Sequence, residues 1–308
     1  MRQAAPRPAC TRIVLLAALA LRAALVAAYA HAVVGMRVFP GTLTFPDPGV
    51  TDELDLNYAG AALSPAPGES TPYSQSLALS DSKTLTPRLA VSIGTGYQYT
   101  PGGGLPKGFG NLALGLDYRL WKNDGQETLI TGALNESLGD SGSPGVGTTY
   151  SVFSPTLLFG RGLGDLPSAW RDLRPLAITG IAAANIPSAA GIPKSLTWGL
   201  SVQYSLPYLQ SYVRDVGLHA PFNNLVPLVE FPMQTYTSGP YAGQTLGTIN
   251  PGVVWIGHYG QIGIEATLPI NRASGHGLGV ILGVGFYFDD IYPHTLGAPL
   301  FSATPETL

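Results

Sequence analysis

Charge is what this 308-residue chain has least of. Charged residues make up 11% of the sequence, whereas soluble domains average about 25%. The chain has four lysines and no basic cluster beyond its first residues, which argues against nucleic acid as a partner. Its hydrophobic content of 45% excludes a disordered chain, because such chains are poor in apolar residues.

Cysteine is almost absent as well. The only cysteine is Cys10, so the rest of the chain uses no disulfide and no thiol chemistry. Glycine and proline are abundant instead, at 39 and 27 residues, and this content excludes a coiled coil or a fold of long helices. What remains is a chain that is rich in turns, poor in charge and apolar in patches.

Residues 1–32 predict a secretory signal peptide. Three arginines and no acidic residue precede the apolar run 13–21, and small residues ending at Ala32 offer cleavage sites. A membrane anchor is the alternative, but Arg22 keeps the apolar stretch shorter than the roughly 20 residues that a spanning helix needs. We therefore expect export, followed by removal of this segment.

Apolar residues alternate with small or polar residues through most of the remaining sequence. In 89–99 the odd positions carry Leu, Val, Ile, Thr and Tyr, and the even positions carry Ala, Ser, Gly and Gln. Such runs match the roughly 9–11 residues of a transmembrane strand rather than the five or six of a typical globular strand. The polar face holds glycine and almost no lysine, unlike the outer face of a soluble sandwich. We interpret the apolar face as facing lipid and the other as facing a barrel interior.

This interpretation predicts an all-β fold, a transmembrane antiparallel up-and-down β-barrel of about twelve strands. We expect the strands near 52–60, 71–82, 88–99, 109–122, 127–137, 148–160, 174–186, 194–206, 224–236, 245–257, 260–271 and 277–288. The expected division is a signal peptide at 1–32, an N-terminal periplasmic segment at 33–51, the outer-membrane barrel at 52–288 and a C-terminal tail at 289–308.

The connections alternate in kind, as they do in barrels with two unlike ends. Two of those on the expected periplasmic side, 161–173 and 207–223, are longer than the short turns that are usual there. The first of them could hold a small helix around 167–172. Prolines weaken the ninth expected strand most, at Pro227 and Pro232.

Six charged or amide side chains inside the expected strands fall on the face away from lipid. The set is Asp117, Arg119, Gln203, Glu230, Gln234 and Glu265. A midplane Arg or Lys on the lipid face would cost about 2–4 kcal/mol, so this placement agrees with the barrel. These side chains either line a lumen and bind a solute, or form an internal plug that only stabilises the barrel. Both interpretations stay open here.

The sequence contains no motif that strongly indicates catalysis or metal binding. The stretch 139–144 resembles the nucleophile segment of chymotrypsin-like proteases, but the only histidine before it is His31, in the expected signal peptide. The later histidines show no metal-ligand spacing. We therefore predict no catalytic residue, no metal and no cofactor, with a barrel lipid hydrolase that uses a Ser-His pair at one rim as an alternative.

The stretches 35–54 and 288–301 carry a family resemblance. The first reads GMRVFPGTLTFPDPGVTDEL and the second FDDIYPHTLGAPLF. Both resemble the proteobacterial outer-membrane family labelled "putative MetA-pathway of phenol degradation". The resemblance implies a barrel related in role to carriers of hydrophobic compounds, and it names no catalytic residue. One departure is that a tail of about twenty residues follows the last strand, whereas such barrels usually end on an aromatic residue.

These observations together predict a non-enzymatic channel or carrier in the cell outer membrane. The expected solutes are small and hydrophobic or aromatic, and the expected partners are outer-membrane lipid and the barrel-assembly machinery. The alternatives are the lipid hydrolase and a structural or adhesive surface barrel with a closed lumen. The sequence names neither the solute nor the oligomeric state.

Overall fold

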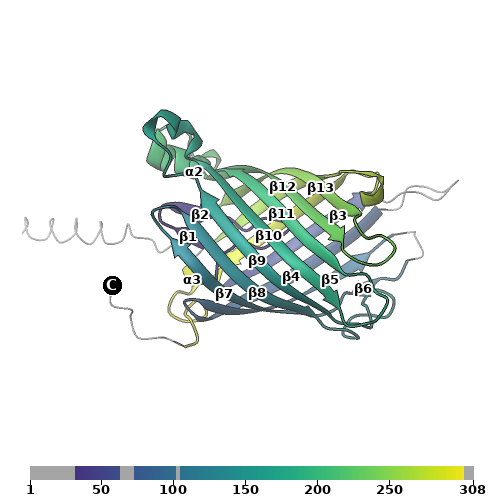
Figure 1. Ribbon diagram of the computed structural model, residues 1–308. Helices are drawn as coiled ribbons and strands as arrows, with labels where there is room; N and C mark the ends of the chain where they lie inside the picture. Colours follow the sequence, from purple (N-terminus) through teal and green to yellow (C-terminus); the bar gives the residue numbers. More distant parts are fainter. Residues whose placement is uncertain (1–31, 63–72, 102–104, 302–308) are drawn as a thin grey trace, which may run out of the picture.

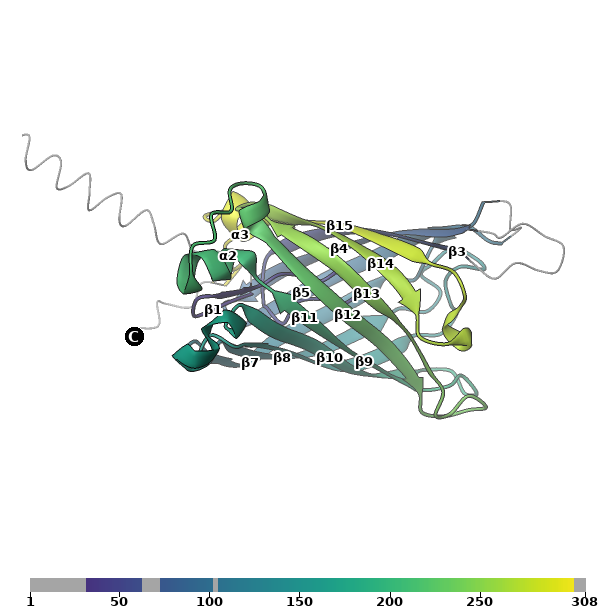
Figure 2. The same cartoon turned by 90° about the horizontal axis from the view of Figure 1, so that it is seen from above.

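Figures 1 and 2 show a barrel of tilted strands with both ends of the described chain near one rim. The computed structural model describes residues 32–62, 73–101 and 105–301. Most of the expected signal peptide, part of the glycine-rich loop around residue 103 and the end of the tail lie outside the described residues. Twelve antiparallel strands close the barrel, which confirms the predicted fold class.

The barrel strands coincide with the predicted ones to within a few residues. They are β3 Glu53–Ala62, β4 Tyr73–Thr86, β5 Leu89–Tyr99, β7 Ala113–Asn123, β8 Thr128–Ser137, β9 Val152–Gly162, β10 Leu176–Pro187, β11 Ser195–Tyr204, β12 Leu225–Tyr236, β13 Thr245–Ile256, β14 Gly260–Pro269 and β15 Gly279–Tyr287. Each strand pairs with its neighbour along the chain, and β15 pairs with β3 to close the ring. The two-residue strand β6 Gly108–Phe109 adds to β5.

The two faces of the strands differ as the alternation predicted. On the outer face Leu116, Ile264 and Leu282 are 39%, 47% and 44% exposed. On the inner face Thr131 and Ser201 are fully buried. An exposed apolar outer surface with polar groups inside is the reverse of a soluble protein, and it is the arrangement that lipid requires.

The N-terminal segment lies inside the barrel, which corrects the prediction of a separate periplasmic segment at 33–51. It begins as a hairpin of β1 Ala32–Val34 and β2 Arg37–Phe39 and then runs into the lumen. Leu43 packs there with Leu228 and Val254. The physical reason is that the segment carries several large apolar side chains, which are stabilised by burial.

Glycines on the inner face leave the room that this segment occupies. A Cβ atom on Gly263 would lie 2.5 Å from Cδ1 of Leu43, and one on Gly160 would lie 3.1 Å from Cζ of Phe39. Larger residues at these positions would displace the segment. Glycine on the inner face therefore relieves crowding, and what it makes room for is the chain's own N-terminus.

The two long connections form small helices at the same rim as the hairpin (Figure 1). The 3-10 helix η1 Ser168–Leu173 confirms the predicted helix in the first of them. The second holds α2 Leu206–Tyr208, the π-helical turn η2 Leu209–Val213 and the 3-10 turn η3 Phe222–Asn224. The 3-10 turn η4 Arg272–Ser274 lies in the connection between β14 and β15. In the described part of the chain, no helix is long and apolar enough to cross a membrane.

Proline interrupts the wall where the sequence indicated weakness. Strand β12 continues through Pro232, but its pairing with β13 lapses there: Glu230 pairs with Asn250, and the next pair is Met233 with Gly247. Proline has no N–H to donate to the ladder. The strand survives because its pairing with β11 is continuous on the other side.

The C-terminal tail returns to the rim of the barrel after the short helix α3 Phe288–Ile291. The backbone N–H groups of Leu300 and Phe301 donate to the carbonyls of Thr84 and Leu85, at 3.1 and 2.8 Å. The ammonium of Lys83 donates to two further tail carbonyls, each at 2.8 Å. The described part of the tail is therefore held against β4 at the N-terminal rim.

Candidate functional site in the barrel lumen

A cavity of about 600 Å³ remains in the lumen beside the N-terminal segment. Strands β3, β4, β5 and β7 contribute much of its wall, and the segment contributes the opposite side. Its polar lining is made mainly of small hydroxyl and amide groups and of acids, and the acidic residues are Asp47, Glu53, Asp55, Asp81 and Asp117. Phe45, Ile181 and Ile281 supply an apolar part of the lining.

The six residues predicted from strand parity have different surroundings. Asp117 lines the large cavity and Gln234 lines a second, smaller one. Gln203 is 2% exposed and donates to the Thr179 hydroxyl at 3.2 Å. Arg119 lies on the inner face of β7, where its backbone N–H donates to the Arg88 carbonyl at 2.9 Å. Their role in solute binding stays a prediction.

Glu230 and Glu265, the remaining two, are covered by the N-terminal segment. Both are fully buried, as is Asn250 beside them. The backbone N–H of Thr44 donates to Glu230 at 3.2 Å, and the Thr44 hydroxyl also donates to it. Neither carboxyl group borders the two lumen cavities, and for this pair the internal plug stays a prediction.

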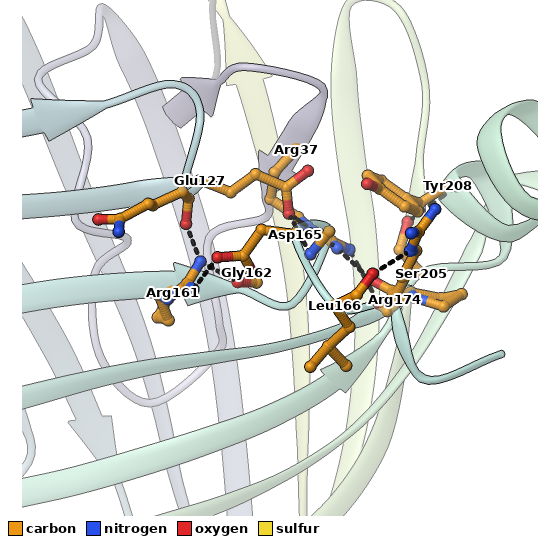
Figure 3. A network of polar contacts seen from close by, with 12 residues as sticks. Arg37, Glu127, Arg161, Gly162, Asp165, Leu166, Arg174, Ser205 and Tyr208 are labelled. Atoms are coloured by element: carbon orange, nitrogen blue, oxygen red, sulfur yellow. Dashed lines mark hydrogen bonds and ion pairs between the residues drawn. The ribbon is translucent and has the colours of Figure 1, made fainter. Parts of the chain in front are cut away.

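Arg37 anchors the N-terminal segment at the rim (Figure 3). Its side chain is fully buried and forms an ion pair with Glu127 at 3.1 Å. It also donates to the carbonyl of Pro175 at 2.9 Å and to the carbonyl of Arg174. Its guanidinium lies over the ring of Tyr208, 3.9 Å from the centroid, a distance suited to a cation–π contact.

Both long rim connections contribute to the anchor. Arg174 and Pro175 end the first connection, and Tyr208 belongs to the second, so each long connection supplies a contact to Arg37. Burial raises the pKa of Tyr208 to about 12, and the Glu127 carboxylate contributes to the rise. Its hydroxyl therefore stays protonated at neutral pH.

The sequence reasoning missed Arg37, Asp47, Glu53 and Asp55. Glu53 and Asp55 share the inner face of β3, so the parity argument that selected Asp117 could have found them. Arg37 and Asp47 lie in the N-terminal segment, where no strand pattern marks a direction. The apolar content of that segment was the available signal that it is buried.

A second cavity of about 360 Å³ adjoins the first. Phe45 and Pro46 line both cavities. The second cavity is also lined by Trp198 and Met233, which pair with each other on the outer face of β11 and β12. The second cavity is therefore lined by residues from both faces of the barrel wall, next to Pro232, where the pairing of β12 with β13 is interrupted.

The cavities hold no assembled hydrolytic pair. Serines line the large cavity, but none of its described lining residues is a histidine. Ser141, in the protease-like stretch, accepts from the backbone N–H of Leu112 at 2.9 Å and donates to the carbonyl of Leu138 at 2.6 Å. That stretch is a loop between β8 and β9, as a Gly/Ser/Asp/Pro composition indicates.

Fold and lumen together define the class of the protein: a closed, twelve-stranded antiparallel β-barrel with an apolar outer surface. No protein-family model and no curated protein sequence matches the chain. The resemblance to the phenol-degradation family therefore stays a prediction.

Solved structures are similar to the chain in fold. The COG4313 outer membrane channel from Pseudomonas putida F1 is 14% identical, with a TM-score of 0.49, and the match covers 82% of this chain and 100% of that one. The NanC porin is 9% identical, with a TM-score of 0.47 and coverage of 75% and 98%. The KdgM porin in complex with disordered oligogalacturonate is 10% identical, with a TM-score of 0.45 and coverage of 77% and 99%.

Proposed function

We propose that the protein is an outer-membrane channel or carrier that passes small hydrophobic solutes through its lumen without transforming them. The observation that carries this proposal is a solute-sized cavity inside a closed barrel whose outer surface is apolar. Small-molecule pockets commonly measure about 300–1,000 Å³, and the larger cavity has about 600 Å³. The exposed apolar side chains of the strands are those that lipid would cover.

The second cavity supports a hydrophobic solute. Leu246, Met233 and Trp198 supply apolar surface, and the lining reaches residues on the outer face of the wall. A solute that leaves the lumen here would meet lipid rather than water. An apolar solute gains free energy from such a transfer, whereas a sugar or an ion loses it.

A structural barrel with a closed lumen is the second candidate, because the N-terminal segment fills part of the lumen and covers Glu230 and Glu265. Ion conductance in planar bilayers separates the two. A channel gives discrete conductance steps that disappear when the protein is heat-denatured before insertion. A solute-tight barrel that still shows heat-modifiable migration on gels would contradict the channel and favour the structural role.

Filling the second cavity tests the proposed path. We expect Thr197→Trp to slow uptake of a radiolabelled monocyclic aromatic compound by cells that depend on this protein, because Thr197 lines that cavity. The control is Thr237→Trp, at an exposed position beyond the end of β12. Equal uptake by the two variants, at equal amounts in the outer membrane, would rule out this path.

A further inference from the structure

The charged residues that line the larger cavity are all acidic. Four carboxyl groups face it from the N-terminal segment and from the inner faces of β3 and β7, those of Asp47, Glu53, Asp55 and Asp117. None of its described lining residues is Lys, Arg or His. Like charges around a low-dielectric cavity focus a negative potential into it. A cation placed there is attracted by every one of these groups.

Asp47 gives an independent sign of a missing partner. Its side chain is 5% exposed. One carboxylate oxygen accepts from the backbone N–H of Gly49 at 2.5 Å, but the other is buried without a hydrogen-bond partner. A buried polar atom without a partner costs free energy, and a donor bound in the cavity would relieve that cost.

The arrangement fits an organic cation better than a metal ion. In the described part of the chain, no three His, Cys, Asp or Glu residues are grouped to hold a metal. A cavity of about 600 Å³ is also far larger than a single ion needs. Beside the acids, Phe45 and Ile181 offer an apolar surface that continues into the second cavity.

From these observations we infer that the lumen binds small amphipathic organic amines. The ammonium group donates to Asp47 and is attracted by Asp55 and Asp117, while the apolar body lies against Phe45 and Ile181. This inference rests on the proposed function and narrows its solute class from hydrophobic compounds in general to cationic ones with an apolar body. An ammonium head also explains why a barrel with an apolar second cavity keeps an acidic first one.

Three probes of nearly equal size test this inference: benzylammonium, benzyl alcohol and benzoate, which carry charges of about +1, 0 and −1 at neutral pH. Binding to the purified barrel is measured by calorimetry against empty micelles. We expect benzylammonium to bind best and benzoate worst. In the triple variant Asp47→Asn, Asp55→Asn, Asp117→Asn, we expect benzylammonium to bind at least about tenfold more weakly, equivalent to about 1.4 kcal/mol.

The matched control is Glu136→Gln, which removes one acid from the exposed outer face of β8. Asparagine at position 47 can still accept from Gly49, so the turn is retained. Equal binding of the three probes to the native protein, or an unchanged preference in the triple variant, would overturn the inference. Preferential binding of benzylammonium without ion conductance would uphold the inference about the solute and contradict the proposed channel. Ion conductance without a preference for benzylammonium would uphold the channel and contradict the inference.

Discussion

Replacing Arg37 with alanine is expected to free the N-terminal segment from the lumen and to raise the ion conductance of the barrel. Arg37 is fully buried, and it holds the segment through Glu127, two backbone carbonyls and the Tyr208 ring. Removing one partner of a buried ion pair costs about 3–5 kcal/mol, because it leaves the other charge unpaired. The cost weakens the bound position of the segment, and the unpaired Glu127 carboxylate at the rim also destabilises the barrel.

Single-channel recording and limited proteolysis measure the outcome. In the R37A variant we expect larger conductance steps and cleavage within residues 40–51, which the native barrel protects. The matched control is Arg272→Ala, which removes an exposed arginine from the connection between β14 and β15. A segment that stays protected in R37A, with unchanged conductance, would show that Arg37 is not the anchor.

A second variant separates the effect of the unpaired Glu127 charge from the effect of losing the Arg37 contacts. Arg37→Ala combined with Glu127→Gln leaves no unpaired ion, so the barrel should regain part of its stability toward urea while the segment stays released. Glu127 has a positive φ of 47° and accepts from the backbone N–H of Gly164 at 3.1 Å. Glutamine can keep that hydrogen bond, so the rim connection is expected to remain in place.

Arginine at two adjacent positions of β4 is expected to have very different effects. Leu79→Arg places a charge on the outer face, where Leu79 is 46% exposed, and should cost about 2–4 kcal/mol of unfolding free energy in lipid vesicles. Ala78→Arg places the same charge on the inner face, beside the acidic cavity. The second variant should cost much less, because its guanidinium faces water and carboxylates.

Urea unfolding in vesicles, monitored by tryptophan fluorescence, measures both variants under one condition. The two substitutions share their strand and introduce the same side chain, so the difference between them reports mainly the environment of each face. Equal losses of stability would contradict the assignment of the outer face to lipid.

The strands could be predicted because their signal is local. Alternation with a period of two marks a strand and its faces from the residues themselves, so Leu116 outside and Asp117 inside follow without knowledge of the fold. The lapse at Pro232 was also foreseeable, because proline lacks the N–H that a ladder needs. What the alternation could not show was how the pairing with β11 sustains that strand.

The site could be predicted only in part, because it depends on contacts distant in sequence. Arg37 meets Glu127 across 90 positions of the chain, and neither residue stands in a pattern that marks it. The course of the N-terminal segment follows from closure of the barrel around it. Of the carboxyl groups at the cavity, Asp117 was predicted from parity, whereas Asp47 has no strand neighbours from which parity could be judged.

The placement of the two strand faces is the central claim, and nitroxide labelling along β4 tests it most directly. The chain's single cysteine is Cys10, so removal of the expected signal peptide leaves each introduced cysteine unique. Labels at positions 77 and 79 should be accessible to lipid-dissolved oxygen, and labels at 76, 78 and 80 to a water-soluble nickel complex. An alternation of the two accessibilities from one position to the next supports the account, and water accessibility at all five positions would contradict it.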